Sequence, residues 1–150
     1  MVQERQLTAY RRYDIGFVFQ FYNLVQNLTV KENVELATQI CKEPLDIVKT
    51  IEAVGLSDRI GNFPSQLSGG EQQRVVIARA LITHPSVIFA DEPTGNLDAA
   101  SAETVAQMLT LAASKYQQTI VMVTHDRQMA EYADRILTIT DGNVTGGVGV

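Results

Sequence analysis

The segment Leu67–Gln73 reads Leu-Ser-Gly-Gly-Glu-Gln-Gln and holds the clearest chemistry in the sequence. Ser68 and Glu71 have the spacing of a capping box, which predicts the start of a helix. The adjacent Gly69 and Gly70 bare the backbone there, so that a ligand can approach the main chain closely. A helix amino terminus also offers unpaired N–H groups and the positive end of the helix dipole. The segment is therefore either a well-capped helix start alone or, in addition, a site for an anion such as phosphate.

Two adjacent carboxylates follow the apolar run Val87–Ala90. A carboxylate at a strand end, such as Asp91, can hold Mg²⁺, usually through water. The next residue, Glu92, points in a different direction and can polarise an attacking water as a general base. The alternative is that both acids only cap the turn Pro93–Asn96, and the pair alone leaves both interpretations open.

Polar residues also end two other apolar runs. Gln20 follows Ile15–Phe19, and His125 follows Thr119–Thr124. The amide of Gln20 can donate and accept hydrogen bonds but is uninformative by itself. A lone histidine at a strand end is usually structural, so His125 alone leaves its role open. His84, in a Thr-His-Pro loop, is interpreted as a surface residue.

A parallel sheet would bring these residues together. The apolar runs are too short for helices and rich in β-forming residues, which predicts strands buried on both faces. Helical patterns separate them, so the fold class is α/β with a mainly parallel sheet. Ligands of such sheets bind at the carboxyl ends of the strands, where four candidates fall: Gln20, Asp91, Glu92 and His125.

Helix signals fill the connections between the strands. A capping box at Thr29–Glu32 predicts a helix to about Ile40, and residues 21–66 form a small helical insert. The remaining expectations are a helix from Pro44 stopped by Gly55 in a left-handed cap, helices over Glu71–Leu81 and Ala99–Leu111, a short helix through Ala133, a strand over Ile136–Thr140, a hairpin turn at Asp141-Gly142 and a frayed tail at 146–149.

Composition limits the function classes. The chain has 150 residues, the size of one domain, with 45% hydrophobic and 19% charged residues. A formal net charge of −5 gives no support to nucleic acid or an anionic lipid surface as the main partner. The start lacks an apolar signal region, and no run of about 18 apolar residues could span a bilayer. We therefore expect a cytosolic protein whose membrane role comes through a partner.

Taken together, the motifs resemble those of the ATP-binding-cassette (ABC) family. The segment Leu67–Leu81 resembles its signature motif, Val87–Glu92 its Walker B strand and Asn96–Asp98 its D-loop. Gln20 is similar to the Q-loop glutamine and His125 to the switch histidine. The order and spacing also fit, over about residues 7–144. The resemblance implies a P-loop NTPase-like α/β fold with an inserted helical subdomain.

A narrower resemblance concerns two short segments. Residues 7–12, Leu-Thr-Ala-Tyr-Arg-Arg, and residues 19–24, Phe-Gln-Phe-Tyr-Asn-Leu, are similar to the bacterial lipoprotein-release and macrolide-export subgroup. Subunits of that subgroup pair with membrane proteins that extrude or extract lipids, peptides or drugs.

The family resemblance implies a head-to-tail dimer, with a second copy or a second cassette, that holds two ATP molecules at its interface. Each ATP lies between the P-loop of one subunit and the signature motif of the other. In this scheme Glu92 polarises the attacking water and His125 senses the γ-phosphate. Asp91 and Gln20 hold Mg²⁺. The nucleotide held by the partner subunit contacts Ser68, Gly69, Gly70 and Gln72, and Asp98 lies at the dimer interface.

The resemblance also divides the chain. It implies an ATPase core over 1–20 and 81–150, truncated at its amino end, and a helical signature subdomain over 21–80 that docks on a transmembrane permease. The protein would then sit on the inner face of the cell membrane through that permease.

The sequence departs from the family in one respect. A P-loop reads Gly-x-x-x-x-Gly-Lys-Ser/Thr, but none of the ten glycines precedes a lysine, and only 19 residues precede Gln20. Losing about three charge-assisted hydrogen bonds, at roughly 1.5–3 kcal/mol each, would weaken a micromolar ATP site to millimolar or worse. We expect no tight ATP binding or hydrolysis by this polypeptide alone. We also expect an exposed apolar sheet face that favours self-association.

Three interpretations stay open at this point. The chain is a fragment of an ATP hydrolase, or a shortened cassette that acts as a binding module without hydrolysis. The third is a family member in DNA repair or translation. The compact insert of 47 positions between Gln20 and Leu67 favours a transporter over the third interpretation.

Overall fold

The computed structural model describes residues 14–149. The segment 7–12, on which the narrower resemblance partly rests, lies outside the described residues, as does most of the expected core segment 1–20.

Three parallel strands form the central sheet, in the order β1 (Ile15–Phe19), β2 (Val87–Asp91) and β3 (Thr119–Val123). The pairing runs in register from Ile15 opposite Val87 to Phe19 opposite Asp91, and β3 continues it on the other side of β2. The predicted α/β fold with a parallel sheet is confirmed. All three carboxyl ends consequently lie at one edge.

The helices lie where local signals place them. At the start of α2 (Val30–Thr38), the Glu32 N–H donates to Thr29 Oγ1 over 3.2 Å and the Thr29 N–H donates to Glu32 Oε2 over 2.7 Å, so the predicted capping box is confirmed. The others are α3 (Ile47–Ala53), the 3₁₀ turns η1 (Ser57–Arg59) and η2 (Pro64–Gln66), α4 (Gly69–Leu81), α5 (Ala99–Tyr116) and α6 (Arg127–Ala130).

Three helix boundaries differ from expectation by three residues or more. The short helix α6 ends at Ala130 rather than at Ala133. The second helix begins at Ile47 rather than at Pro44, because Asp46 caps it by accepting from the Lys49 N–H over 2.8 Å. Gly55 ends this helix with φ +72°, the predicted left-handed cap. The helix α5 extends five residues past Leu111, to Tyr116. Its C-cap residue Gln117 has a left-handed φ of 52°, although it is not a glycine.

The carboxyl-terminal residues form a hairpin of β4 (Arg135–Thr140) and β5 (Asn143–Gly149). Asp141 and Gly142 make the predicted turn with φ values of 50° and 78°, as a primed turn requires. The expectation of a frayed tail at 146–149 is wrong. Those residues pair with β4, which satisfies their backbone hydrogen bonds despite the low β propensity of glycine.

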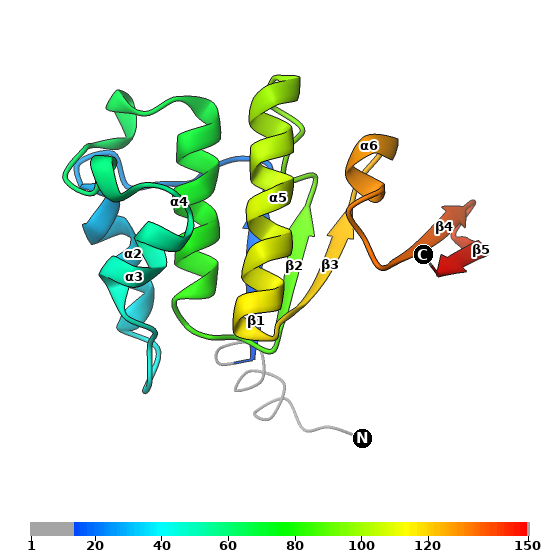
Figure 1. Cartoon of the computed structure of the whole chain (residues 1–150), viewed down its shortest axis with the longest axis horizontal. Coiled ribbons are helices and arrows are strands. Elements are labelled where there is room, and N and C mark those ends of the chain that lie inside the picture. The colour runs from blue at the N-terminus through cyan, green and yellow to red at the C-terminus, as the bar shows by residue number, and fades with distance from the viewer. Residues whose placement is uncertain (1–13, 150) are drawn as a thin grey trace.

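One face of the sheet is covered by α4 and α5, and α2 packs on the far side of α4 (Figure 1). A single hydrophobic cluster runs through these layers and is fully buried at Val18, Ile88, Ile77 and Ile51, on β1, β2, α4 and α3. Burial of this face fixes the register of the strands and thus the positions of the residues at their ends.

The opposite face of the sheet is open. Phe17 and Phe19 of β1 are 45% and 52% exposed, and Phe89 of β2 is 40% exposed. The ring of Phe17 stacks on both other rings, with centroids 5.8 and 6.0 Å apart. The prediction of strands buried on both faces is wrong for the described residues, whereas the expected exposed apolar face is confirmed.

Among residues 14–149, no helix is both long enough and apolar enough to cross a membrane.

Two neighbouring residues of β2, Ile88 and Phe89, test directly whether only one face of the sheet is buried. Replacing Phe89 by threonine should reduce self-association, measured by sedimentation, and cost about 1 kcal/mol of unfolding free energy or less, because the ring already contacts water. Ile88→Thr should cost at least about 2 kcal/mol by urea denaturation, because Ile88 is fully buried. Equal losses of stability in the two variants would show that the open face is covered in solution.

Candidate functional site

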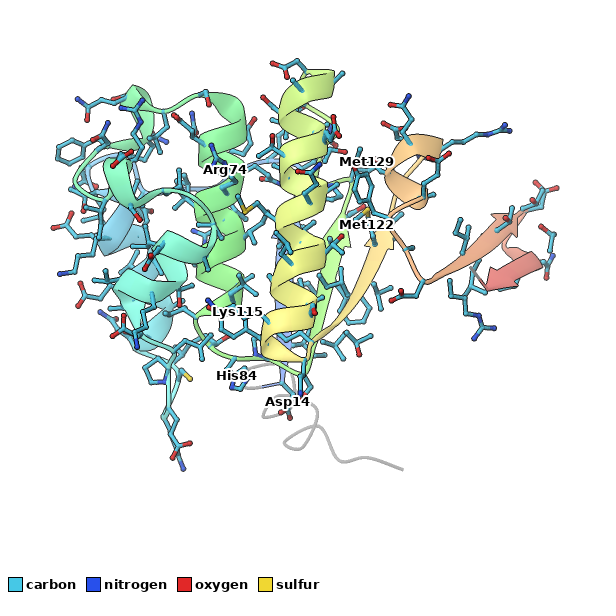
Figure 2. The ribbon with its side chains drawn as sticks, in the orientation of Figure 1. Asp14, Arg74, His84, Lys115, Met122 and Met129 are labelled. Carbon is cyan, nitrogen blue, oxygen red and sulfur yellow. The ribbon has the colours of Figure 1, made fainter. Side chains whose placement is uncertain are left out.

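The candidate residues gather at one edge of the molecule. The arrows of β2 and β3 point toward this edge, and α4 and α5 begin there, because each helix runs antiparallel to the strands (Figure 1). The edge holds the ends of the strands at Gln20, Asp91, Glu92 and His125, and the helix starts at Ser68 and Asp98. His84 lies at the opposite edge with Asp14 and Lys115 (Figure 2).

Glu92 and His125 meet at the centre of this edge. His125 Nε2 lies 3.3 Å from Glu92 Oε1, with the glutamate side chain 23% and the histidine side chain 97% exposed. The contact is an ion pair when the histidine is protonated but lacks hydrogen-bond geometry. Oε1 is buried, with no hydrogen-bond partner among residues 14–149. A buried carboxylate oxygen without a hydrogen bond is uncommon in folded proteins, and a catalytic role is one explanation for it.

The backbone of Glu92 is held in an unfavourable conformation. Its φ is 45°, in the left-handed region that a glutamate rarely adopts, and its N–H donates to Val123 O over 2.9 Å. Asp91 remains in the strand ladder opposite Val123. Asp91 therefore ends the strand while Glu92 begins the loop, and the prediction that the two carboxylates point differently stays a prediction. Strain of this kind persists where the surrounding contacts enforce it.

His125 is fixed by the elements on either side of it. Asp126 caps α6 by accepting from the Gln128 N–H over 2.8 Å. Met129 of α6 packs with Met122 of β3 and with Ala102 and Ala106 of α5 in a small apolar cluster (Figure 2). Because β3 and α6 are both anchored, the backbone of His125 is held while its imidazole reaches into solvent.

The start of α4 is capped as predicted. The Glu71 N–H donates to Ser68 Oγ over 3.2 Å, and the Ser68 N–H donates to Glu71 Oε2 over 2.9 Å. The Ser68 N–H and the nearby Arg59, 3.4 Å away, hold the pKa of Glu71 below its ordinary value against the opposing effect of burial. Gln72 turns back on this start and donates to Leu67 O over 3.4 Å.

Packing against neighbouring side chains favours glycine at both positions of this helix start. A Cβ on Gly69 would lie 2.8 Å from the hydroxyl of Tyr22, and a Cβ on Gly70 would lie 3.0 Å from Cβ of Ser101. Close approach of a ligand to the backbone is therefore not needed to explain the glycines. The anion-site interpretation depends on the surroundings of the helix start instead.

Those surroundings form a small hollow between α4 and α5. Its volume is about 160 Å³, and it is lined by Ser68, Gly70, Arg74, Ala100, Ser101 and Thr104. Arg74 supplies a positive charge. Its Nη1 donates to Val54 O over 3.2 Å, and its Nε has no partner among the described residues. A hollow below the roughly 300–1,000 Å³ of whole-ligand pockets suits one anionic group, not a complete nucleotide.

Asp98 is the N-cap of α5, two residues before Ala100 of the hollow's lining. Its Oδ1 accepts from the Ser101 N–H over 2.7 Å, and this hydrogen bond lowers the pKa of the carboxyl. The carboxylate is otherwise exposed, so Asp98 is accessible to a second protein as well as capping its own helix.

Gln73 joins the start of α4 to the strand ends. It is fully buried, and its Nε2 donates to Phe19 O over 3.1 Å and to Pro93 O over 2.6 Å. These carbonyls belong to the residue before Gln20 and the residue after Glu92. Sequence reasoning missed Gln73, although a polar residue on the apolar face of a predicted helix, with Ile77 and Ala80 beyond it, was a detectable signal.

Two further residues missed by sequence reasoning fix the loop after Gln20. Arg79 donates to Tyr22 O over 3.3 Å and Asn23 O over 3.0 Å, and burial lowers the pKa of its guanidinium. Asn33 is fully buried and donates to the carbonyls of three loop residues: Val25, Leu28 and Thr29. The loop is held by hydrogen bonds to helices α4 and α2.

Gln20 and Asp91 lie one step apart on neighbouring strands, since Phe19 pairs with Asp91. No cluster of three or more His, Cys, Asp or Glu residues in the range 14–149 could hold a metal ion. Mg²⁺ does not need such a cluster, because it keeps waters and uses one or two protein oxygens together with phosphate oxygens. The carboxylate of Asp91 and the amide oxygen of Gln20 fit that pattern.

Stability should depend strongly on Gln73. Gln73→Leu leaves two carbonyls without their donor and should cost about 2 kcal/mol or more of unfolding free energy, measured by urea denaturation. The neighbouring Gln72→Leu, on a half-buried position, should change stability by about 0.5 kcal/mol or less. A loss no larger for Gln73→Leu than for Gln72→Leu would contradict the bridging role.

The capping box should respond to acid. Because the pKa of Glu71 is lowered on folding, its stabilising contribution is complete above its unfolded-state pKa of about 4.3 and is lost as pH falls through the folded-state value. Glu71→Gln should therefore destabilise the protein at pH 7, by at most about 1 kcal/mol, and less at pH 3. Denaturation at both pH values measures this, and a difference between variant and parent that stays constant would refute it.

Comparison with known proteins adds independent evidence. The family model described as ABC transporter matches residues 2–95. The lipoprotein-releasing system ATP-binding protein LolD of Treponema denticola is 45% identical over 148 residues, covering 95% of this chain and 66% of the relative. The LolD protein of Cytophaga hutchinsonii is 42% identical over 146 residues, with coverages of 94% and 67%. The chain thus spans about two thirds of the length of these curated relatives.

Solved structures agree with the sequence comparison. The ATP-binding cassette MJ0796, in a dimeric post-hydrolysis state bound to ADP and Pi, matches with a TM-score of 0.80 and 38% identity, over 99% of this chain and 68% of that one. A second dimeric structure of the same cassette matches with a TM-score of 0.79. Fold, motifs and relatives lead to one conclusion: the chain belongs to the ABC transporter family.

Proposed function

We propose that this chain is part of an ATP-binding subunit that couples ATP hydrolysis to export through a membrane permease. The observation that carries the proposal is the meeting of Glu92 and His125 at the carboxyl edge of the sheet, 3.3 Å apart, with the carboxylate oxygen Oε1 lacking a hydrogen bond among residues 14–149.

Glu92 is suited to the role of general base. An unbonded carboxylate oxygen accepts a hydrogen bond from water and polarises it for attack on a γ-phosphate. The water oxygen forms the new bond to phosphorus, the bond from phosphorus to the bridging oxygen of ADP breaks, and the proton of the water passes to the carboxylate. Glu92 itself lies just past the strand, with its backbone in the left-handed region.

His125 and the Mg²⁺ ligands complete the hydrolytic edge. The exposed imidazole of His125 can donate to a γ-phosphate oxygen while remaining next to Glu92. Asp91 and Gln20 would hold Mg²⁺, which when bound neutralises charge on the phosphates. These roles require only that a nucleotide lie along the strand ends, where open α/β sheets bind their ligands.

The hollow at the start of α4 is proposed to meet the nucleotide held by a second cassette in a head-to-tail dimer. Ser68, Gly69, Gly70 and Gln72 would contact its γ-phosphate, with Asp98 at the interface. The small volume, the positive Arg74 and the adjacent starts of α4 and α5 support this, because each helix amino terminus favours an anion. The dimeric cassette structures are consistent with such an arrangement.

Residues 21–80 are proposed to form the subdomain that docks on the permease, and 1–20 with 81–150 to belong to the ATPase core. This would place the chain at the inner face of the cell membrane. The relatives are ATP-binding proteins of lipoprotein-releasing systems, which supports a lipid-linked export substrate.

A polypeptide of only these 150 residues should bind Mg-ATP weakly, because the sequence contains no Gly-Lys pair to form a P-loop. Isothermal titration should give a dissociation constant of about a millimolar or above, as expected when roughly 4.5 kcal/mol or more of charge-assisted hydrogen bonding is missing. A low-micromolar constant would refute this proposal.

The hydrolytic role can be tested in a chimera that joins the P-loop segment of the Treponema denticola relative to this chain. The chimera should hydrolyse ATP, and Glu92→Gln should lower kcat by about 10²–10⁴-fold with ATP affinity nearly unchanged. Glu131→Gln, an exposed acid on the next turn of chain after α6, is the matched control and should leave kcat unchanged.

Full activity in the Glu92→Gln chimera would overturn the assignment of the general base. A chimera that binds ATP and its partner cassette but never hydrolyses, with Glu92 intact, would instead establish a non-hydrolysing binding module.

A further inference from the structure

The side chain of Gln20 is held by a residue from another segment. Gln20 Nε2 donates to Asn96 Oδ1 over 3.1 Å, and Asn96 Nδ2 donates to the backbone carbonyl of Gln20 over 3.2 Å. The two residues are 76 positions apart in the sequence. Because each side chain donates once, the contact fixes both the position of the Gln20 backbone and the orientation of its amide.

Gly95 makes room for this arrangement. A Cβ at Gly95 would lie 2.6 Å from Gln20 Nε2 and 3.0 Å from Gln20 Cδ. The amide of Gln20 therefore lies directly against the backbone of the loop after β2. Any larger residue at position 95 would displace it.

The backbones on both sides of the contact are fixed by the same helix. Gln73 of α4 donates to Phe19 O, next to Gln20, and to Pro93 O, three residues before Asn96. Glu92 begins the same loop, and its carbonyl accepts from the Gly95 N–H over 3.1 Å. The two partners therefore approach each other from anchored segments.

The amide oxygen Oε1 of Gln20 has no hydrogen-bond donor among the described residues. The amide nitrogen is committed to Asn96, whereas none of the residues 14–149 donates to Gln20 Oε1. Rotating the amide by 180° would place its oxygen against Asn96 Oδ1 and lose the hydrogen bond. Asn96 thus determines that the oxygen, the atom that can bind a hard cation, is the one presented.

We propose that Asn96 is a positioning residue that presents Gln20 Oε1 to Mg²⁺ at the nucleotide. The proposal rests on the function proposed above for Gln20. It follows a general rule for metal ligands, in which a partner outside the coordination sphere holds the second polar atom of the ligand and fixes its orientation.

The first test does not depend on nucleotide or activity. The test measures the chemical shifts of the Gln20 side-chain amide protons in the ¹⁵N-labelled 150-residue chain. One of the two protons should be hydrogen-bonded, with a chemical shift different from that of a free side-chain amide. Asn96→Ala should return it to the free position, whereas Asn96→Asp keeps an acceptor for Nε2 and should retain most of the shift. Asn27→Ala, at an exposed asparagine, is the matched control and should change nothing at Gln20.

The second test measures metal affinity in the chimera described above, with Mn²⁺ as a spectroscopic probe and a non-hydrolysable ATP analogue. Asn96→Ala should weaken Mn²⁺ binding by about tenfold, which is the lower end of the range for mutating a residue that orients a metal ligand. The affinity for the analogue without metal should stay constant. In a Gln20→Ala background, Asn96→Ala should have no further effect, because the residue acts only through Gln20.

Two results would overturn the proposal. One is a Gln20 amide resonance that Asn96→Ala leaves unchanged, and the other is an equal loss of Mn²⁺ affinity from Asn96→Ala with and without Gln20. Failure of the function proposed above is distinguishable from both. In that case the parent chimera fails to bind or hydrolyse ATP, whereas the resonance test in the isolated chain gives its own answer.

Discussion

The buried amide of Gln73 links three segments of the candidate site: helix α4, the end of β1 and the loop after β2. Its nitrogen donates to two backbone carbonyls, Phe19 O at the end of β1 and Pro93 O in the loop after β2. A side-chain nitrogen that is fully buried must find acceptors, because leaving it unpaired is expensive. The helix that begins at Ser68 cannot shift relative to these strand ends without breaking both bonds. The hollow proposed to bind an anion and the edge proposed to hydrolyse ATP are therefore linked through Gln73.

This constraint explains how strain is tolerated at Glu92. A left-handed glutamate costs about 1–3 kcal/mol and persists only when its surroundings over-determine it. Here the residue is held on both sides, by its own N–H bond to Val123 and by the Gln73 bond to Pro93, which follows it. The ordering of the loop continues to Asn96 and from there to Gln20. Gln20 and the loop after Glu92 are thus positioned by hydrogen bonds to neighbouring segments.

The sequence predicted most of the fold because its signals are local. Capping boxes at Thr29 and Ser68 and the turn at Asp141-Gly142 depend on residues a few positions apart, so spacing alone identifies them. The strand ends of a parallel sheet share an edge, which allowed the meeting of Glu92 and His125 to be predicted before any geometry was known. The start of the second helix was predicted wrongly because two helix-start signals compete there. The N-cap signal of Asp46 is stronger than the first-turn signal of Pro44.

Non-local contacts could not be predicted in the same way. Gln73 to Pro93, Arg79 to Tyr22 and Gln20 to Asn96 join segments that only the folded chain brings together. Gly69 and Gly70 were explained by ligand approach, but the structure shows that they also pack closely against Tyr22 and Ser101. Burial on both faces was inferred from apolar runs, which cannot reveal whether anything covers the second face of a sheet.

Hydrogen exchange of side-chain amides measures the central constraint most directly. If Gln73 bridges the signature helix and the two strand ends, its Nε2 protons should exchange only through global unfolding, whereas those of the neighbouring Gln72 should exchange near the free rate. Equal and rapid exchange of the two glutamines would contradict the bridge and the rigid edge built on it.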